Sequence, residues 1–260
     1  MLAVKHQPTT PSLSDRQGAS SAERLLAMPS PGNTAASRKA ALLATIACVG
    51  KGGSGKSTLI TNLSAIALAA GFKVGIIDAD PQQSSFVWRS VRGRNDIPVC
   101  RCSPETLEDA IEAARRAGIE LVFIDMPPDL RHVPGVARHA NLVLIPMRPA
   151  LFDLKVTRSL IPILNSAGCS FAVILNAAPP IRDLDDSPMV RQAREALDDI
   201  GPRLWRRQIT NRVTVPYPTV RGAGVAETEP ASHAAHEFHA LWSAVHKTLK
   251  LEGPVHEVAP

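Results

Sequence analysis

The fold is decided by residues 50–58, which read Gly50-Lys51-Gly52-Gly53-Ser54-Gly55-Lys56-Ser57-Thr58. Residues 50–57 fit the phosphate-binding loop pattern G-x-x-x-x-G-K-[ST]. The preceding residues, 42–49, are apolar and partly β-branched, which predicts a buried strand. The following residues, 59–70, are rich in Leu and Ala and end at Gly71, which predicts a helix with a glycine C-cap. A strand, a glycine-rich loop and a helix in this order are what phosphate binding needs.

The loop carries the chemistry of polyphosphate binding. Its glycines let backbone N–H groups face the phosphates, and the helix N-terminus adds a partial positive charge. Lys56 is expected to reach the β- and γ-phosphates, and the Ser57 hydroxyl is expected to bind Mg²⁺. A glycine-rich turn that binds nothing is the weaker interpretation, because a strand and a helix flank the loop. The predicted cradle consists of Gly52, Gly53, Ser54, Gly55, Lys56, Ser57 and Thr58.

Carboxylates follow two further predicted strands. Residues 73–78 predict a strand that ends at Asp78, and Asp80 comes two residues later. Residues 119–125 predict a strand that ends at Asp125. Ligands bind at the carboxyl ends of strands in open α/β sheets, so we expect all three carboxylates to lie near the loop. For Asp80, which precedes a proline, a simple chain turn is the alternative.

Strands and helices alternate along the rest of the chain. Strands are predicted at residues 97–102, 141–146, 171–176 and 203–209, and helices at residues 83–92, 104–117, 152–167, 188–200 and 232–250. This alternation predicts an α/β fold with a doubly wound, mostly parallel sheet and helices on both faces. Residues 1–38, rich in Ser, Pro, Ala, Gln and Gly, are predicted to be a disordered arm. The single domain is expected to span residues 39–260.

Composition limits the classes of protein that the chain can be. A chain of 260 residues can bury one substantial core. Its 4 cysteines are scattered without a CxxC pair, so we expect reduced thiols and no zinc or iron–sulfur site. Neither a signal peptide nor a membrane-spanning stretch is predicted, so a cytoplasmic protein is expected. A net charge of +5 permits contact with nucleic acid or anionic lipid without requiring either.

Residues 51–58, KGGSGKST, resemble the deviant Walker A motif of the ParA/MinD family of P-loop ATPases, and the chain looks closest to its ParA-type members. Residues 78–82 resemble the family's DxDPQ motif, and residues 125–128 its DxPP ending, with Met126 where the family often has Thr. The resemblance covers about residues 40–250. It implies ATP and Mg²⁺ as cofactors, weak hydrolysis of ATP to ADP and phosphate, and an ATP-dependent homodimer.

The same resemblance assigns roles to individual residues. Lys51 is expected to reach the partner's phosphates across the dimer, and Asp80 to orient the attacking water; with Lys56 they form the expected catalytic set. The expected magnesium-binding residues are Ser57, Asp78 and Asp125. Asn176, at the end of a predicted strand, is expected to bind the adenine edge, although Asn at a strand end also serves local turns.

The leading expectation for function is a ParA-type switch that partitions plasmid or chromosomal DNA. It would act through nucleotide-controlled, non-specific binding to double-stranded DNA, with a ParB-type activating partner and a nucleoid association. Non-specific binding needs only phosphate contacts. The proposed contacts are Arg206, Arg207, Arg212 and Arg221, for which a solvated basic edge is the alternative.

Three other functions remain as alternatives. A ParA-like ATPase of this kind could position a protein cargo instead of DNA. A MinD-like membrane switch would insert the apolar stripe of residues 232–250, but that stripe also suits core packing and its tail is not basic, so a membrane partner is not expected. A metabolic or iron–sulfur relative lacks support, since no second substrate motif is visible and no cysteine follows Asp125 until Cys169.

Overall fold

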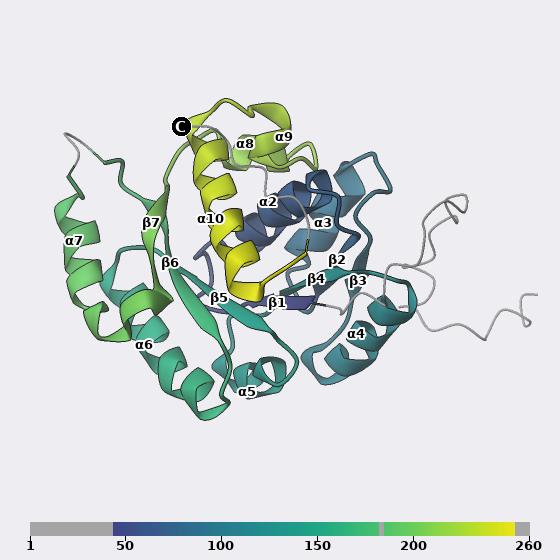
Figure 1. Cartoon of the computed structure of the whole chain (residues 1–260), viewed down its shortest axis with the longest axis horizontal. Coiled ribbons are helices and arrows are strands. Elements are labelled where there is room, and N and C mark those ends of the chain that lie inside the picture. The colour runs from purple at the N-terminus through teal and green to yellow at the C-terminus, as the bar shows by residue number, and fades with distance from the viewer. Residues whose placement is uncertain (1–43, 182–184, 253–260) are drawn as a thin grey trace, which may run out of the picture.

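The computed structural model describes residues 44–181 and 185–252, and the predicted arm lies outside these residues. Within them, seven parallel strands form one sheet in the order β3-β2-β4-β1-β5-β6-β7 (Figure 1). The strands are β1 (Ala44–Cys48), β2 (Val74–Asp78), β3 (Val99–Arg101), β4 (Leu121–Asp125), β5 (Leu142–Met147), β6 (Phe171–Ala178) and β7 (Leu204–Thr210). The predicted doubly wound parallel sheet is confirmed.

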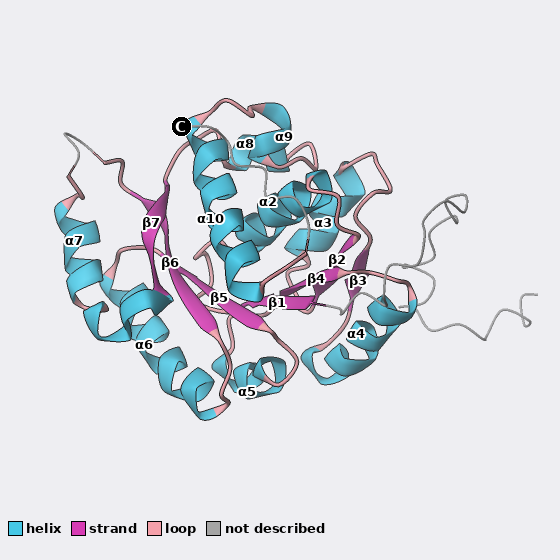
Figure 2. Ribbon diagram, in the orientation of Figure 1, coloured by secondary structure: helices cyan, strands magenta, loops and turns pink. Residues whose placement is uncertain are grey.

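Helices cover both faces of the sheet (Figures 1 and 2). One face carries α2 (Lys56–Ala69), α3 (Ser84–Val91), α8 (Pro216–Thr219), α9 (Val225–Thr228) and α10 (His233–Leu249). The other carries α4 (Leu107–Arg116), α5 (Val133–Ala137), α6 (Leu151–Ser166) and α7 (Pro188–Glu195). Three short 3₁₀ segments, η1 (Pro104–Thr106), η2 (Leu130–His132) and η3 (Asp198–Arg203), complete the connections among the described residues.

Each face of the sheet has its own hydrophobic core. Side chains alternate along a strand, so β1 sends Ile46 and Cys48 toward α2 and α10 and sends Ala47 toward the opposite helices. Because both faces are covered, every residue of β2 and β4 is buried, and the strands read as continuous apolar runs in the sequence.

The register of the central strands places the site. β1 lies between β4 and β5, with Cys48 opposite Asp125. β2 lies on the other side of β4, with Asp78 opposite Asp125. Since these strands are parallel and in register, the loop that follows β1 and the two strand-end carboxylates meet at one edge of the sheet.

The C-terminal helix α10 packs on the core. Phe238, Leu241, Trp242 and Val245 are each at most 2% exposed and belong to the cluster around α2. This confirms the core-packing interpretation of the apolar stripe. Among the described residues, no helix has the length and apolar character needed to cross a bilayer.

The predicted helix boundaries were wrong in three places, the first being the helix predicted at residues 59–70, which begins earlier, at Lys56. The predicted helix at residues 104–117 begins as the 3₁₀ turn η1 and becomes α-helical only at Leu107. The helix predicted at residues 188–200 ends at Glu195, and η3 follows with Gly201 at φ 56° and Pro202 inside it. This glycine and proline interrupt helical hydrogen bonding before β7, but they lie beyond the end of α7 and do not explain its break after Glu195. The short helices α5, α8 and α9 were not predicted, because four or five residues carry no helical periodicity.

Candidate functional site

The glycine loop leads directly into α2, which begins at Lys56. Gly55 is the N-cap of this helix and has a left-handed φ of 94°. A Cβ added there would lie 2.2 Å from Nδ2 of Asn176, so only glycine fits. The helix N-terminus, with its unpaired N–H groups and partial positive charge, therefore opens onto the loop.

A cavity of about 500 Å³ lies in front of the loop. Its walls come from the loop and first turn of α2, from the ends of β2, β4, β5 and β6, and from the segment after β7. The predicted site residues among its lining are Gly52, Gly53, Ser54, Gly55, Lys56, Ser57, Thr58, Asp80, Asn176 and Arg212. Two further lining residues, Gln82 and Pro128, belong to the motifs noted in the sequence, and the others are Ser84, Arg148, Ala177, Ile209, Thr210, Asn211, Val215 and Pro216.

Two strand-end carboxylates, Asp78 and Asp125, and a third, Asp80, just after β2, lie beside this cavity. Asp78 is buried, and its two oxygens accept hydrogen bonds from the backbone N–H groups of Phe86 (2.9 Å) and Asp80 (3.2 Å). Burial raises the pKa of Asp78 above its ordinary value, although these backbone hydrogen bonds oppose the rise. Asp80 is also buried; its Oδ1 accepts from the backbone N–H of Gln82, and the residue lines the cavity.

Asp125, at the end of β4, is fully buried. Burial raises its pKa to about 6, while the hydroxyls of Ser57 and Ser85 favour the ionised form and limit the rise. Ser85 Oγ donates to Asp125 Oδ2 at 2.8 Å. Oδ1 of Asp125 is buried without a hydrogen-bond partner. A buried carboxylate oxygen without a hydrogen-bond partner destabilises the fold unless a ligand such as a metal ion contacts it.

These residues fit a magnesium ion that is completed by phosphates. Among the described residues, no group of three His, Cys, Asp or Glu side chains could hold a metal alone. Mg²⁺ is usually bound by one or two carboxylates, waters and substrate phosphates. The free oxygen of Asp125 and the Ser57 hydroxyl are hard oxygen donors of this kind. When bound, the ion would neutralise charge on the phosphates.

Magnesium-dependent ATP binding is expected to weaken below pH 6. The raised pKa means that Asp125 in the folded, metal-free chain takes up a proton near pH 6, well above the ordinary range of aspartate. A proton and Mg²⁺ compete for the same carboxylate, so half-saturating Mg²⁺ should rise about threefold between pH 6.5 and pH 5.5. Titrations of ATP binding with Mg²⁺ at several pH values in this range measure the change in half-saturating Mg²⁺. A flat profile would mean that Asp125 does not bind the ion.

Lys51 makes a specific contact inside its own subunit. Its Nζ lies 2.9 Å from Oδ2 of Asp153 in the first turn of α6. Asp153 is buried, whereas the Lys51 side chain is 41% exposed. The other oxygen of Asp153 accepts from the backbone N–H of Arg148, a residue of the cavity wall. Asp153 thus links the loop to the start of α6, a contact that the sequence does not reveal.

Asn176 lies against the loop at the end of β6. Its Nδ2 donates to the carbonyl oxygen of Ser54 at 2.7 Å. The next residue, Ala177, has a left-handed φ of 46°, which turns the chain along the cavity wall. Binding of an adenine edge by Asn176 remains a prediction, and the observed contact shows that this side chain also holds the loop.

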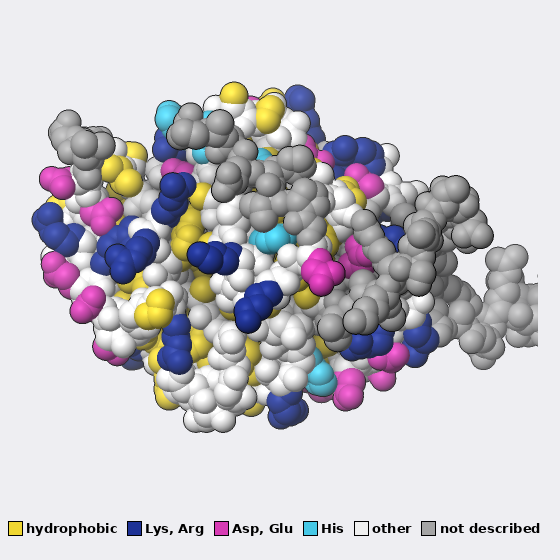
Figure 3. Space-filling view, viewed as in Figure 1, with side chains coloured by type: hydrophobic (Ala, Val, Ile, Leu, Met, Phe, Trp, Pro, Cys, Tyr) yellow, Lys and Arg dark blue, Asp and Glu magenta, His cyan; other side chains and the backbone are white. Residues whose placement is uncertain are grey.

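The four predicted DNA-binding arginines have different surroundings. Arg206 and Arg207 are exposed on the edge strand β7, and Arg221 stacks over the Tyr217 ring. Arg212 lines the cavity, is half-buried and bonds Glu237 of α10 at 3.3 Å, and its predicted contact with DNA stays a prediction. On the face shown in Figure 3, Lys and Arg side chains are dispersed rather than gathered in one patch.

The parallel sheet, the glycine loop at the N-terminus of α2 and the strand-end carboxylates together define a P-loop nucleotide-binding protein. The chain belongs to the CobQ/CobB/MinD/ParA nucleotide binding domain family, whose model matches residues 45–222. It is therefore a ParA/MinD-type ATPase that uses ATP and Mg²⁺.

Individual relatives agree with this family. The chain is 36% identical over 139 residues to maintenance of carboxysome distribution protein A of Gloeobacter kilaueensis, covering 50% of this chain and 61% of that protein. It is 28% identical over 185 residues to the protein of the same name from Halothiobacillus neapolitanus, covering 67% of this chain and 82% of that protein. A solved structure described as Cyanthece apo McdA has the same fold, with a TM-score of 0.65 and 18% identity. The match covers 78% of this chain and 99% of that chain.

Proposed function

We propose that this chain is an ATP-driven positioning ATPase whose cargo is a protein assembly. The observation that carries the proposal is the combination of the KGGSGKST loop with relatives named for maintaining carboxysome distribution. These relatives favour the protein-cargo alternative over the leading expectation of DNA partition. The nature of the assembly is not specified by these residues.

The proposed working form is an ATP-dependent homodimer. Lys51 can reach a partner's phosphates only after leaving Asp153, so dimerisation would exchange an internal ion pair for one across the interface. Directly beside Asp153, Leu151 and Phe152 are 75% and 70% exposed. Exposed apolar side chains that flank the site are suited to burial against a second copy.

Further proposals concern the surroundings in which the dimer works. Non-specific contact with DNA would let the nucleoid serve as the surface along which the dimer acts, with Arg206, Arg207 and Arg221 as the exposed candidates. An activating protein, equivalent in role to a ParB-type partner, would stimulate hydrolysis. A cytoplasmic location is part of the same proposal.

The decisive test compares the positioning of a protein assembly with the inheritance of DNA in the native cell. Deleting the gene should disperse or cluster one protein assembly, as seen by fluorescence microscopy, while plasmid and chromosome loss rates stay at wild-type values. A chain carrying Lys51→Ala should fail to restore positioning, and a chain carrying Lys73→Ala, which changes an exposed lysine away from the loop, should restore it. Increased plasmid loss with normally placed assemblies would return the function to DNA partition.

Asp80→Ala is expected to bind ATP normally and to hydrolyse it at least about 100-fold more slowly. Asp80 lines the cavity, and removing the group that places the attacking water affects the chemical step rather than binding. The variant should therefore accumulate as an ATP-bound dimer. On one preparation, ATP titration measures binding, phosphate release measures hydrolysis, and sedimentation measures the dimer. Normal turnover would assign the water to another residue.

A further inference from the structure

The helix α3 touches both strand-end carboxylates with its first turn. Ser85 Oγ donates to Asp125 Oδ2 at 2.8 Å, and the Phe86 backbone N–H donates to Asp78 Oδ2 at 2.9 Å. The N-cap residue Gln83 has a left-handed φ of 53° and gives no side-chain cap. Asp78 therefore supplies the acceptor that the helix itself lacks, and it ties α3 to the end of β2.

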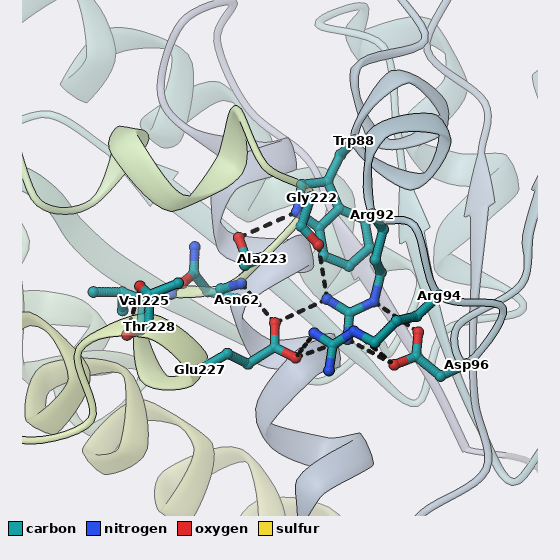
Figure 4. A network of polar contacts seen from close by, with 11 residues as sticks. Asn62, Trp88, Arg92, Arg94, Asp96, Gly222, Ala223, Val225, Glu227 and Thr228 are labelled. Atoms are coloured by element: carbon teal, nitrogen blue, oxygen red, sulfur yellow. Dashed lines mark hydrogen bonds and ion pairs between the residues drawn. The ribbon is translucent and has the colours of Figure 1, made fainter.

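The other end of α3 is clamped by buried polar contacts (Figure 4). The Arg92 side chain is fully buried and forms ion pairs with Asp96 (2.7 Å) and Glu227 (2.8 Å). It also donates to the carbonyl oxygen of Gly222, and Trp88 Nε1 donates to that of Ala223. The clamp consists of Trp88, Arg92, Asp96, Gly222, Ala223 and Glu227.

With both ends held, the helix presents Ser85 in one fixed position. Ser85 and Asp125 are both 0% exposed, so no water competes for the bond between them. The hydroxyl occupies Oδ2 and leaves Oδ1 as the oxygen without a partner. A carboxylate that is held through one oxygen presents the other in a defined direction, which is how neighbouring residues orient metal ligands.

We propose that Ser85 is a positioning residue for magnesium: it holds the carboxylate of Asp125 so that Oδ1 faces the ion. This inference rests on the proposed role of Asp125 as a magnesium ligand. It adds a residue outside the phosphate loop and outside the two strand-end aspartates to the machinery of ATP binding. The helix that follows Asp80 thereby takes part in metal binding through a side chain.

The test measures Mg²⁺ dependence rather than activity alone. Binding of a fluorescent, slowly hydrolysed ATP analogue is titrated with Mg²⁺ and repeated in EDTA. Ser85→Ala should raise half-saturating Mg²⁺ about tenfold while leaving the affinity in EDTA unchanged. Ser85→Thr, which keeps the hydroxyl, should restore most of the loss. Ser90→Ala on the same helix, whose hydroxyl donates to the carbonyl oxygen of Val87 within α3, should match the wild type.

Two controls separate this inference from the site assignment beneath it. If Asp125→Asn leaves the Mg²⁺ dependence unchanged, the magnesium role of Asp125 fails, and the Ser85 proposal fails with it. If Asp125→Asn shifts the dependence but Ser85→Ala does not, only the Ser85 proposal is overturned. Thermal unfolding without Mg²⁺ checks that each variant is folded. If Ser85→Ala does not fold, Ser85→Cys replaces it, because its thiol is similar in size to the hydroxyl but is a weak hydrogen-bond donor.

Discussion

Replacing Lys56 with alanine is expected to abolish measurable ATP binding, with an affinity loss of at least about 100-fold. Lys56 is the first residue of α2, is only 6% exposed and lines the cavity between the loop and the strand-end carboxylates. No other lysine of the described chain lines that cavity. Without this ammonium the phosphates would lose the lysine at the N-terminus of α2, and the remaining cations of the cavity wall, Arg148 and Arg212, come from the ends of β5 and β7 instead of from the loop.

The matched control for Lys56→Ala is Lys73→Ala, which removes the same charge from an exposed position at the start of the second βα unit. It should bind ATP like the wild type. Isothermal titration with ATP and Mg²⁺ measures both variants, and far-UV circular dichroism confirms that each is folded. ATP affinity within about threefold of wild type in folded Lys56→Ala would contradict the proposed binding site.

The second large effect is expected on stability. Glu227→Ala should lower the free energy of unfolding by about 3 to 5 kcal/mol, because it leaves the buried guanidinium of Arg92 without its main partner. Glu227 bonds both terminal nitrogens of Arg92 at 2.8 Å and also accepts from the backbone N–H of Gly224. Asp96 alone would then have to compensate the charge.

Glu229→Ala is the control, since it removes the same charge two residues away, where the described structure records no side-chain partner. It should change the free energy of unfolding by less than about 0.5 kcal/mol. Urea unfolding followed by tryptophan fluorescence measures both. A loss below about 1 kcal/mol in Glu227→Ala would mean that solvent or Asp96 satisfies Arg92 once the partner is removed.

The sequence predicted the parts of the site that depend on strand ends and on the loop. Asp78 and Asp125 terminate runs of buried residues, and parallel strands in register bring such ends together. Gly55 and Lys56 belong to a spacing that only a turn into a helix satisfies. Periodicity and motif spacing are local properties of the chain, so they can be read before any tertiary contact is known.

The contacts that the sequence did not reveal join residues far apart in the chain. Lys51 with Asp153, Arg92 with Glu227 and Asn176 with Ser54 carry no local signal, because the fold alone brings the partners together. Arg212 shows the same limit. Its charge alone led to the prediction of a DNA contact, and nothing in the local sequence indicates its place on the cavity wall beside Glu237.

The position of β1 in the sheet has a consequence for the synthesis of the chain. Its neighbours β4 and β5 contribute Phe123 and Leu142 beside Ile46, so both partners of the first strand are translated long after it. Until then an apolar strand and its loop remain without a sheet, and pairings between such distant segments form slowly. We therefore expect the ATP site to be assembled late, and the nascent chain to be exposed to aggregation until β5 has left the ribosome.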